Sequence, residues 1–219
     1  MGLALRRVGQ NRRGWRCLPM LFGTETSVSV YELRQMMTRA TSQEMCVTIF
    51  AVIGKVVFGQ ARIGMLDVFT GGFLLWAGVA FLAAMRSDSR HGAWGWWLSC
   101  AVLLGAAVGV KWEAVPYVSF AGIAFLWLRQ RDPARFGGMH WLPALAVMGV
   151  VSIATYLATF APASFYASDP LTLGRLVPFQ FEMWALQTQV LAPHNYQSSW
   201  WSWPLMLRPI WYFYEPDQG

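Results

Sequence analysis

Asp67, Arg62 and Lys111 are polar residues that stand at the ends of long apolar segments, where chemistry at a membrane surface would take place. A carboxylate such as Asp67 can accept a proton or orient a cation or a reacting group. The guanidinium of Arg62 and the ammonium of Lys111 can hold an anion such as a phosphate. Each also has a structural explanation, because a helix dipole favours an acid at its start and basic side chains snorkel to the interface.

The spacing of these residues limits how they can meet. Arg62 precedes Asp67 by five residues, which on a continuous helix turns the two side chains about 140 degrees apart. On such a helix the two residues lie at a similar depth in the membrane but on different faces. If the helix begins after Arg62, the guanidinium can still turn toward a phosphate. Lys111 is followed by Trp112 and Glu113, so a carboxylate is at hand to neutralise it.

A second group of candidates lies between His194 and Glu215, where four Trp, three Tyr and one Phe surround Arg208. Such amphipathic rings settle at the lipid headgroup level, so this aromatic block predicts an interfacial segment. His194 can transfer a proton near neutral pH, or be an ordinary surface residue. Arg208 can bind a phosphate, stack on its aromatic neighbours or face headgroups. The candidates for an acceptor or interface loop are Tyr196, Trp200, Trp201 and Trp203.

The composition predicts the class of fold that must position these residues. The mean hydropathy is +0.37, 56% of the residues are hydrophobic and only 13% are charged. That leaves too little polar surface for a water-soluble globule of 219 residues, and favours a polytopic, all-α membrane bundle. The net charge of +6 is scattered between apolar segments, which is typical of topology-setting charge rather than of nucleic-acid binding.

Six helices are expected in residues 1–160, and residues 161–219 are expected to form a long outer-face loop that contains the aromatic block. A spanning helix needs roughly 20 apolar residues. The segments at 18–33 and 45–60 meet this need less well, because they carry Glu25 and Lys55. The expected helices lie near 18–33, 45–60, 63–85, 93–110, 114–128 and 141–160.

Arginines in alternate connections predict the orientation. Under a six-helix count, the connections after 33, 85 and 128 lie on one side, and each carries at least two arginines. That side should be cytoplasmic, which places Asp67, Lys111 and the aromatic block at the outer face. The arginines between Arg6 and Arg16 would then lie outside, against the usual preference.

Other kinds of site find no support in the sequence. The cysteines and histidines are isolated, so no metal-ligand cluster is predicted. Phosphate-binding, dinucleotide-binding and hydrolase motifs are absent as well. Gly105 and Gly109 have the spacing that lets two helices approach closely, and packing is their expected role.

Three blocks, in this order, carry a family resemblance: GWRCLPMLFGT at 14–24, ARIGMLDVF at 61–69 and HNYQSSWWSWPLMLRPIWYFY at 194–214. Together they resemble the bacterial protein O-mannosyltransferases of the GT-C class. The resemblance implies transfer of mannose from a polyprenyl phosphate carrier to Ser or Thr hydroxyls of a protein, at the outer face of the bacterial inner membrane. It places Asp67 beside the active cavity.

The resemblance assigns expected roles to the candidates. Asp67 and His194 would serve catalysis, while Arg62, Lys111 and Arg208 would bind the donor phosphate. Polyprenyl-phosphate-mannose is the expected donor, the bilayer and an acceptor protein are the expected partners, and nucleic acid is not one. No cofactor is certain, although a divalent metal is compatible with the chemistry.

The chain departs from the family pattern in its acidic residues. Family members usually carry an adjacent Asp-Glu pair in a first outer loop, whereas no two acidic residues are adjacent here. The first block resembles the start of the family's second helix. We therefore expect a fragment that lacks the first helix, the Asp-Glu loop and the C-terminal helices, and that is inactive alone. The alternatives are another GT-C transferase acting on lipid A or a polysaccharide, and a noncatalytic membrane protein or transporter.

Overall fold

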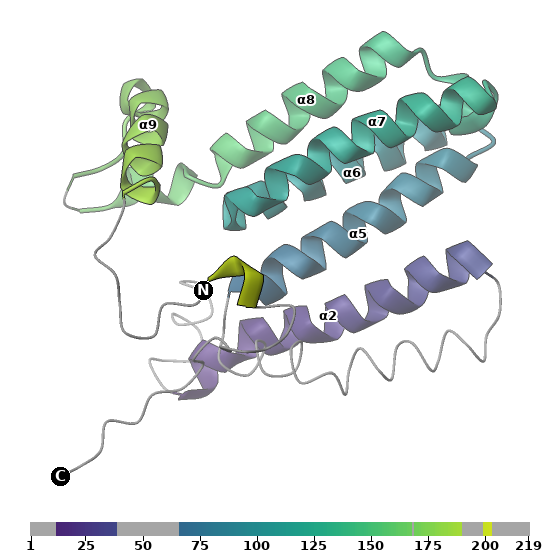
Figure 1. Cartoon of the computed structure of the whole chain (residues 1–219). Helices are drawn as coiled ribbons and strands as arrows, with labels where there is room; N and C mark the ends of the chain where they lie inside the picture. Colours follow the sequence, from purple (N-terminus) through teal and green to yellow (C-terminus); the bar gives the residue numbers. More distant parts are fainter. Residues whose placement is uncertain (1–11, 39–65, 168, 190–198, 203–219) are drawn as a thin grey trace. The chain divides into compact units, whose positions relative to one another are not determined.

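A computed structural model describes residues 12–38, 66–167, 169–189 and 199–202, and in these ranges every regular element is helical (Figure 1). The all-α class is as the sequence predicts, while the helix expected at 45–60 lies outside the described residues. The α-helices are α2 (Arg12–Thr38), α5 (Leu66–Arg86), α6 (Arg90–Val110), α7 (Val115–Arg131), α8 (Trp141–Ala158) and α9 (Leu176–Gln187). The 3-10 turns are η1 (Trp112–Ala114), η2 (Arg135–Gly138), η3 (Ala161–Phe165), η4 (Leu173–Arg175) and η5 (Trp200–Ser202).

Three helical segments within the described ranges are long and apolar enough to cross a membrane, namely Leu66–Arg86, Arg90–Val110 and Trp141–Phe165. The chain is thus a membrane protein built as a helical bundle. Helix α7 has 17 residues, which is short against the roughly 20 that a span needs. Helix α2 has 27 residues, more than the 16 expected, and carries Glu25 within its length.

Local sequence explains where the helices begin and end. Ser89 caps α6, since its side chain accepts a hydrogen bond from the backbone N–H of Gly92, and α6 therefore starts earlier than expected. Lys111 has extended backbone angles (φ −149°, ψ 134°) that end α6. Pro116 lies in the first turn of α7, where a missing N–H costs nothing. His140 caps α8 by accepting from the N–H of Leu142.

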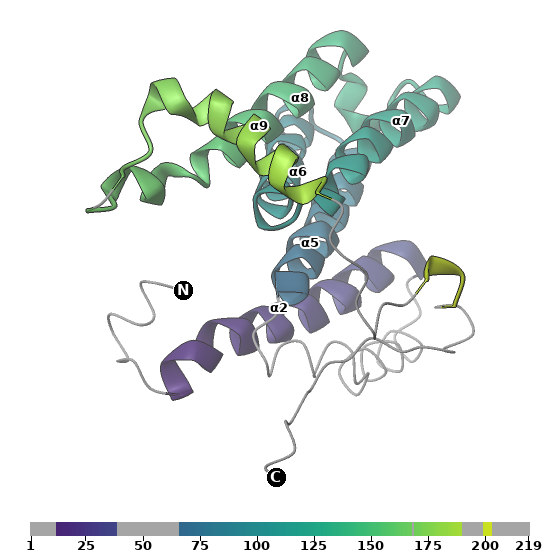
Figure 2. The same cartoon turned by 60° about the vertical axis from the view of Figure 1, so that its left-hand side comes forward.

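The chain divides into two compact units, Met1–Leu171 and Thr172–Gly219. In the first unit, α6 packs against α5 on one side and α8 on another, and α2 packs on α5. Figure 2 shows α2 crossing α5 obliquely. In the second unit, the described elements are η4, α9 and η5, all of which fall in the segment expected to be a loop.

Close contact between α6 and α8 depends on two glycines. A Cβ atom on Gly105 would collide with the backbone carbonyl of Ser152, and one on Gly109 would lie 2.6 Å from Cγ2 of Thr159. The hydroxyl of Ser152 donates to the carbonyl of Ala101 at 3.0 Å across the same interface. The G-x-x-x-G spacing thus serves packing, as the sequence predicts.

An aromatic cluster fills the core near the start of α6. Trp97, Phe125 and Phe136 are each fully buried, and the ring of Phe125 lies 4.7 Å from that of Trp97 and 4.8 Å from that of Phe136. The indole N–H of Trp97 donates to the carbonyl of Ala144 at 2.9 Å, so its one polar atom is satisfied. Phe136 has a φ of 57°, a left-handed conformation that aims its ring from the η2 turn into the bundle.

The helix directions give the first unit two different ends. Asp67 at the start of α5, Lys111 after α6 and Tyr156 near the end of α8 mark one end, which we call the Asp67 end. The opposite end, which we call the arginine end, carries the connections from α5 to α6 and from α7 to α8. Its arginines are Arg86, Arg90, Arg129, Arg131 and Arg135.

Candidate functional site

An ion pair between Asp67 and Lys111 is the centre of the candidate site. The ammonium Nζ of Lys111 donates a hydrogen bond to Oδ1 of Asp67, although the two residues are 44 positions apart. Asp67 lies in the first turn of α5 and Lys111 directly follows the last turn of α6, and the helix dipoles favour each charge at its position. About a third of each side chain is exposed, so a ligand can reach both.

Glu113 adds a second carboxylate to this site. Its Oε1 lies 3.5 Å from Nζ of Lys111, and its side chain is 61% exposed. The hydrogen bond with Asp67 is the largest cause that raises the pKa of Lys111, and the charges of both carboxylates act in the same direction. The lysine is therefore positively charged at neutral pH. Two carboxylates flank one ammonium, and the more exposed of them, Glu113, is the one that an incoming anion would displace.

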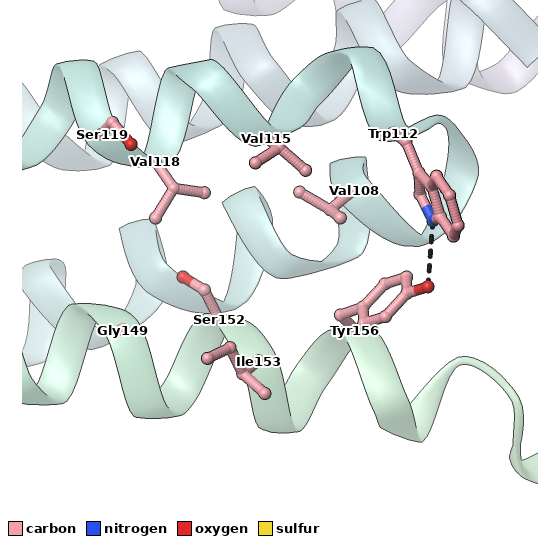
Figure 3. Close-up of a pocket in the computed structure, with 9 residues that line it drawn as sticks. All are labelled: Val108, Trp112, Val115, Val118, Ser119, Gly149, Ser152, Ile153 and Tyr156. Atoms are coloured by element: carbon pink, nitrogen blue, oxygen red, sulfur yellow. Dashed lines mark hydrogen bonds between the residues drawn. The ribbon is translucent and has the colours of Figure 1, made fainter. Parts of the chain in front are cut away.

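An apolar groove of about 530 Å³ lies between α7 and α8, and one of its lining residues, Trp112, directly follows Lys111 (Figure 3). Its two walls are α7 and α8, and Val108 of α6 contributes to its floor. Val115, Val118 and Ile153 line it with hydrocarbon. The groove exists because α7 packs only lightly on α8, whereas α6 and α8 are in close contact.

A hydrogen bond closes the groove at the Asp67 end. The indole N–H of Trp112 donates to the phenol oxygen of Tyr156 at 2.9 Å, and Figure 3 shows the two rings meeting across the groove. Trp112, which lines the groove, directly follows Lys111, which pairs with Asp67 and Glu113. Together they can hold an amphiphile, with the polar head at Lys111 and the hydrocarbon chain along the valines.

The structure brings together only part of the expected site. Asp67 and Lys111 are in contact, a pairing that the sequence alone did not predict. Trp200 and Trp201 lie in η5, where the side chain of Trp201 is 59% exposed. The other expected residues lie outside the described ranges: Arg62, His194, Tyr196, Trp203 and Arg208.

Two residues of the site were missing from the expected set. From the sequence, Glu113 is expected only to neutralise Lys111, although its position two residues after the lysine is a usable signal for a site residue. Tyr156 was not recognised, because it is separated from Trp112 by 44 residues and resembles any tyrosine near the end of an apolar helix. In the described parts of the chain, no three His, Cys, Asp or Glu side chains gather as metal ligands would.

Several apolar helices, a charged pair at one end of the bundle and an apolar groove between α7 and α8 are typical of an integral membrane protein. The family is shown by a match over residues 8–166: the chain belongs to the dolichyl-phosphate-mannose-protein mannosyltransferase family. The resemblance noted in the sequence is thus confirmed.

Individual relatives agree with this assignment. The polyprenol-phosphate-mannose–protein mannosyltransferase of Corynebacterium glutamicum is 25% identical, over 95% of this chain and 50% of the relative. The protein of that name from Mycobacterium tuberculosis is 28% identical, over 93% of this chain and 49% of the relative. The one from Mycolicibacterium smegmatis is 26% identical over similar shares. The chain therefore spans about half the length of these relatives, and no solved structure matches it.

Proposed function

We propose that the chain forms the donor-binding part of a glycosyltransferase that moves mannose from a polyprenyl phosphate carrier to Ser or Thr hydroxyls of a protein. The observation that carries this proposal is that Lys111, which pairs with Asp67, directly precedes Trp112, a residue that lines the apolar groove. Family membership supplies the chemistry, and the names of the relatives state the donor and the class of acceptor.

The donor has two parts that match the two parts of the site. Its phosphate is an anion, and Lys111 is the cation that would pair with it by displacing Glu113. Its polyprenyl chain is pure hydrocarbon, and in the bilayer the valines and Ile153 of the groove would hold it by van der Waals packing. Arg62 and Arg208 are proposed as further phosphate ligands.

The reaction itself requires proton acceptance and charge stabilisation. The acceptor hydroxyl oxygen bonds to the anomeric carbon while the bond from that carbon to the phosphate oxygen breaks, and the hydroxyl proton passes to a base. Asp67 is proposed to orient the reacting groups at this end, with His194 as a candidate for proton transfer. Lys111 would neutralise the charge that develops on the departing phosphate.

The arrangement also suggests an orientation and a location. Arginines favour the cytoplasmic side, so the arginine end would face the cytoplasm and the Asp67 end the outer face. Tyr196, Trp200, Trp201 and Trp203 would then belong to the acceptor side. Since the relatives are bacterial, we propose the bacterial inner membrane as the location.

The test is binding of a photoactivatable polyprenyl-phosphate-mannose analogue to the full chain in lipid nanodiscs. The crosslinker is placed on the first isoprene units, and the adducts are mapped by mass spectrometry. We expect adducts on Val115, Val118 or Ile153, and competition by unlabelled polyprenyl-phosphate-mannose. Charge reversal at Lys111 (Lys111→Glu) should abolish labelling there.

A matched variant at the other end controls for the charge change. Arg131→Glu alters the net charge by the same amount at the arginine end, where Arg131 stacks 3.8 Å from the ring centre of Trp127. It should leave labelling of the groove unchanged. Labelling that is absent, spread over all lipid-facing helices or equally competed by a polyprenyl phosphate with another sugar would contradict the proposed mannose donor site.

A further inference from the structure

We propose that an apolar groove between α2 and α7 binds an anionic phospholipid of the surrounding bilayer, with an acyl chain in the groove and the phosphate at Arg86 and Arg135. This lipid site is separate from the proposed donor site, because no described residue lines both grooves and this one leads to the arginine end. Its ligand belongs to the membrane itself and takes no part in mannosyl transfer.

The groove has a volume of about 350 Å³ and lies on the surface of α5 and α6. Leu33 of α2 lines one side and Phe120 of α7 lines the other, and Figure 1 shows α5 between these two helices. Cys100 and Leu104 of α6 are 1% and 3% exposed, so they form its floor. Phe120 is 58% exposed, so the groove is open on its outer side. Because α5 and α6 are long and apolar enough to cross a membrane, this open side faces the hydrocarbon of a bilayer.

Helix α5 leads from this groove to Arg86. Leu82 lines the groove, and Arg86 follows it by four residues, so the two side chains lie one above the other on the same side of the helix. Arg86 is the last residue of α5 and is exposed. An arginine at this position can keep its hydrocarbon stem on the apolar surface and its guanidinium in the headgroup layer.

A second arginine reaches the same end of the groove from the η2 turn. Phe81 lines the groove, and Met85 lies one turn further along the same side of α5. Nη1 of Arg135 lies 3.9 Å from Sδ of Met85, which places the guanidinium at this end of the groove. Nε of Arg135 donates to Asp132 at 3.3 Å. The guanidinium fork has further N–H donors, and these can bind phosphate oxygens.

The charge of this end favours an anionic lipid over a lipid without net charge. The segments 86–90 and 129–138 carry five arginines and two aspartates. Of these five arginines, the described structure pairs one, Arg135, with a carboxylate. Basic pockets between spanning helices bind anionic headgroups, and each arginine near a membrane surface strengthens such binding about fivefold. A phospholipid with one negative phosphate, such as phosphatidylglycerol, therefore matches both the arginines and the hydrocarbon groove.

Native mass spectrometry of the full chain measures which lipid stays bound. The protein is released from nanodiscs that contain equal amounts of phosphatidylglycerol and phosphatidylcholine with the same acyl chains. We expect phosphatidylglycerol adducts to exceed phosphatidylcholine adducts by about tenfold or more.

The arginine variants test the headgroup part of the site. Arg86→Gln should lower the adduct ratio about fivefold, and the double variant with Arg135→Gln should bring it close to one. Because Arg86 is exposed, its single variant keeps the test valid even where loss of Arg135 disturbs the η2 turn. Arg90→Gln is the matched control, since it removes the same charge at the same end from the exposed start of α6, and it should leave the ratio unchanged.

Ala124→Phe tests the hydrocarbon part of the site without a change of charge. Ala124 lines the groove, so a ring at this position should exclude the acyl chain and remove most of the bound phosphatidylglycerol. The control is Ala146→Phe, on an exposed position of α8 that lines neither groove.

Several outcomes would overturn the proposal. Equal retention of the two lipids by the unchanged chain would show that the groove does not select an anionic lipid. An equal drop for Arg90→Gln and Arg86→Gln would show general attraction to the arginine end rather than a site. Unchanged binding in Ala124→Phe would show that the acyl chain lies elsewhere, and a dimer that carries no phosphatidylglycerol would show that a second copy covers the groove.

Discussion

The two ends of the first unit differ in how completely they are filled. At the arginine end, buried Phe125 and Phe136 pack on Trp97, and Arg129 donates from Nε to the carbonyl of Met139 at 2.5 Å. At the Asp67 end, the charges are partly exposed, and an apolar groove opens between α7 and α8. The comparison teaches that one end of this bundle is closely packed, while the other leaves charges and apolar surface open, as the proposed donor site requires. Five changes test that distinction.

The largest expected effect is on stability, from Phe136→Ala at the arginine end. Removal of a fully buried ring that contacts three other rings should lower the free energy of unfolding by about 3–5 kcal/mol. Titration with a denaturing detergent, followed by circular dichroism, measures this. The fraction of Phe136→Ala protein that remains folded should bind the donor lipid with unchanged affinity. A loss of donor binding in folded protein would contradict the assignment of binding to the Asp67 end.

Gly105→Val tests the α6–α8 interface that connects the ends. The added side chain would collide with the backbone of Ser152 and with Cβ of Thr155 at 2.8 Å, so we expect a loss of about 1–3 kcal/mol of unfolding free energy. The control is Gly95→Val on the same helix, where a Cβ has no neighbour within 4 Å. Equal destabilisation by both variants would mean that helix propensity, rather than close packing, sets the cost.

Lys111→Met should separate binding from stability. Loss of the ammonium should weaken binding of a polyprenyl phosphate about tenfold, which corresponds to about 1.4 kcal/mol. The stability change should stay below about 1 kcal/mol, because the ion pair is a third exposed. Equilibrium binding in nanodiscs, with Arg131→Met as the control, provides the measurement. Unchanged affinity would show that Lys111 serves only to hold Asp67.

Tyr156→Phe makes a smaller change at the groove. The variant removes the acceptor for the indole N–H of Trp112 and should cost about 0.5–1.5 kcal/mol of stability. The indole fluorescence of Trp112, isolated as a difference spectrum against Trp112→Phe, should shift as the N–H loses its partner. Identical spectra and stability would show that this hydrogen bond contributes nothing in the membrane.

The smallest effect is the pH dependence of the Asp67–Lys111 pair. The pKa of Lys111 is raised above its ordinary value of 10.5, so the pair contributes stability that is fully present below that value and is lost as the pH rises through the raised pKa. Between pH 7 and 9 the stability difference between the protein and Lys111→Met should be constant. A difference that falls within this range would contradict a charged lysine held by Asp67.

The sequence predicted the class of fold well, and it predicted that Asp67 and Lys111 lie at the same end of the bundle but not that they are in contact. The length of an apolar run and the positions of arginines can be read directly from the sequence. Helices α5, α6 and α8 and the two ends of the first unit were therefore predictable. The Asp67–Lys111 contact arises from the packing of α5 on α6, and the groove arises from the loose packing of α7, neither of which leaves a pattern in the chain. Helix α9 was missed because its apolar residues do not alternate clearly with polar ones.

A single extended residue, Lys111, separates α6 from η1 and α7. Lys111 links two helical segments. Its side chain donates a hydrogen bond to Asp67 of α5, and the side chain of the next residue, Trp112, donates one to Tyr156 of α8. A movement of α7 that widened the groove would bend the chain close to the residue that carries the positive charge. Entry of a hydrocarbon chain and displacement of Glu113 from the lysine would then be one motion rather than two.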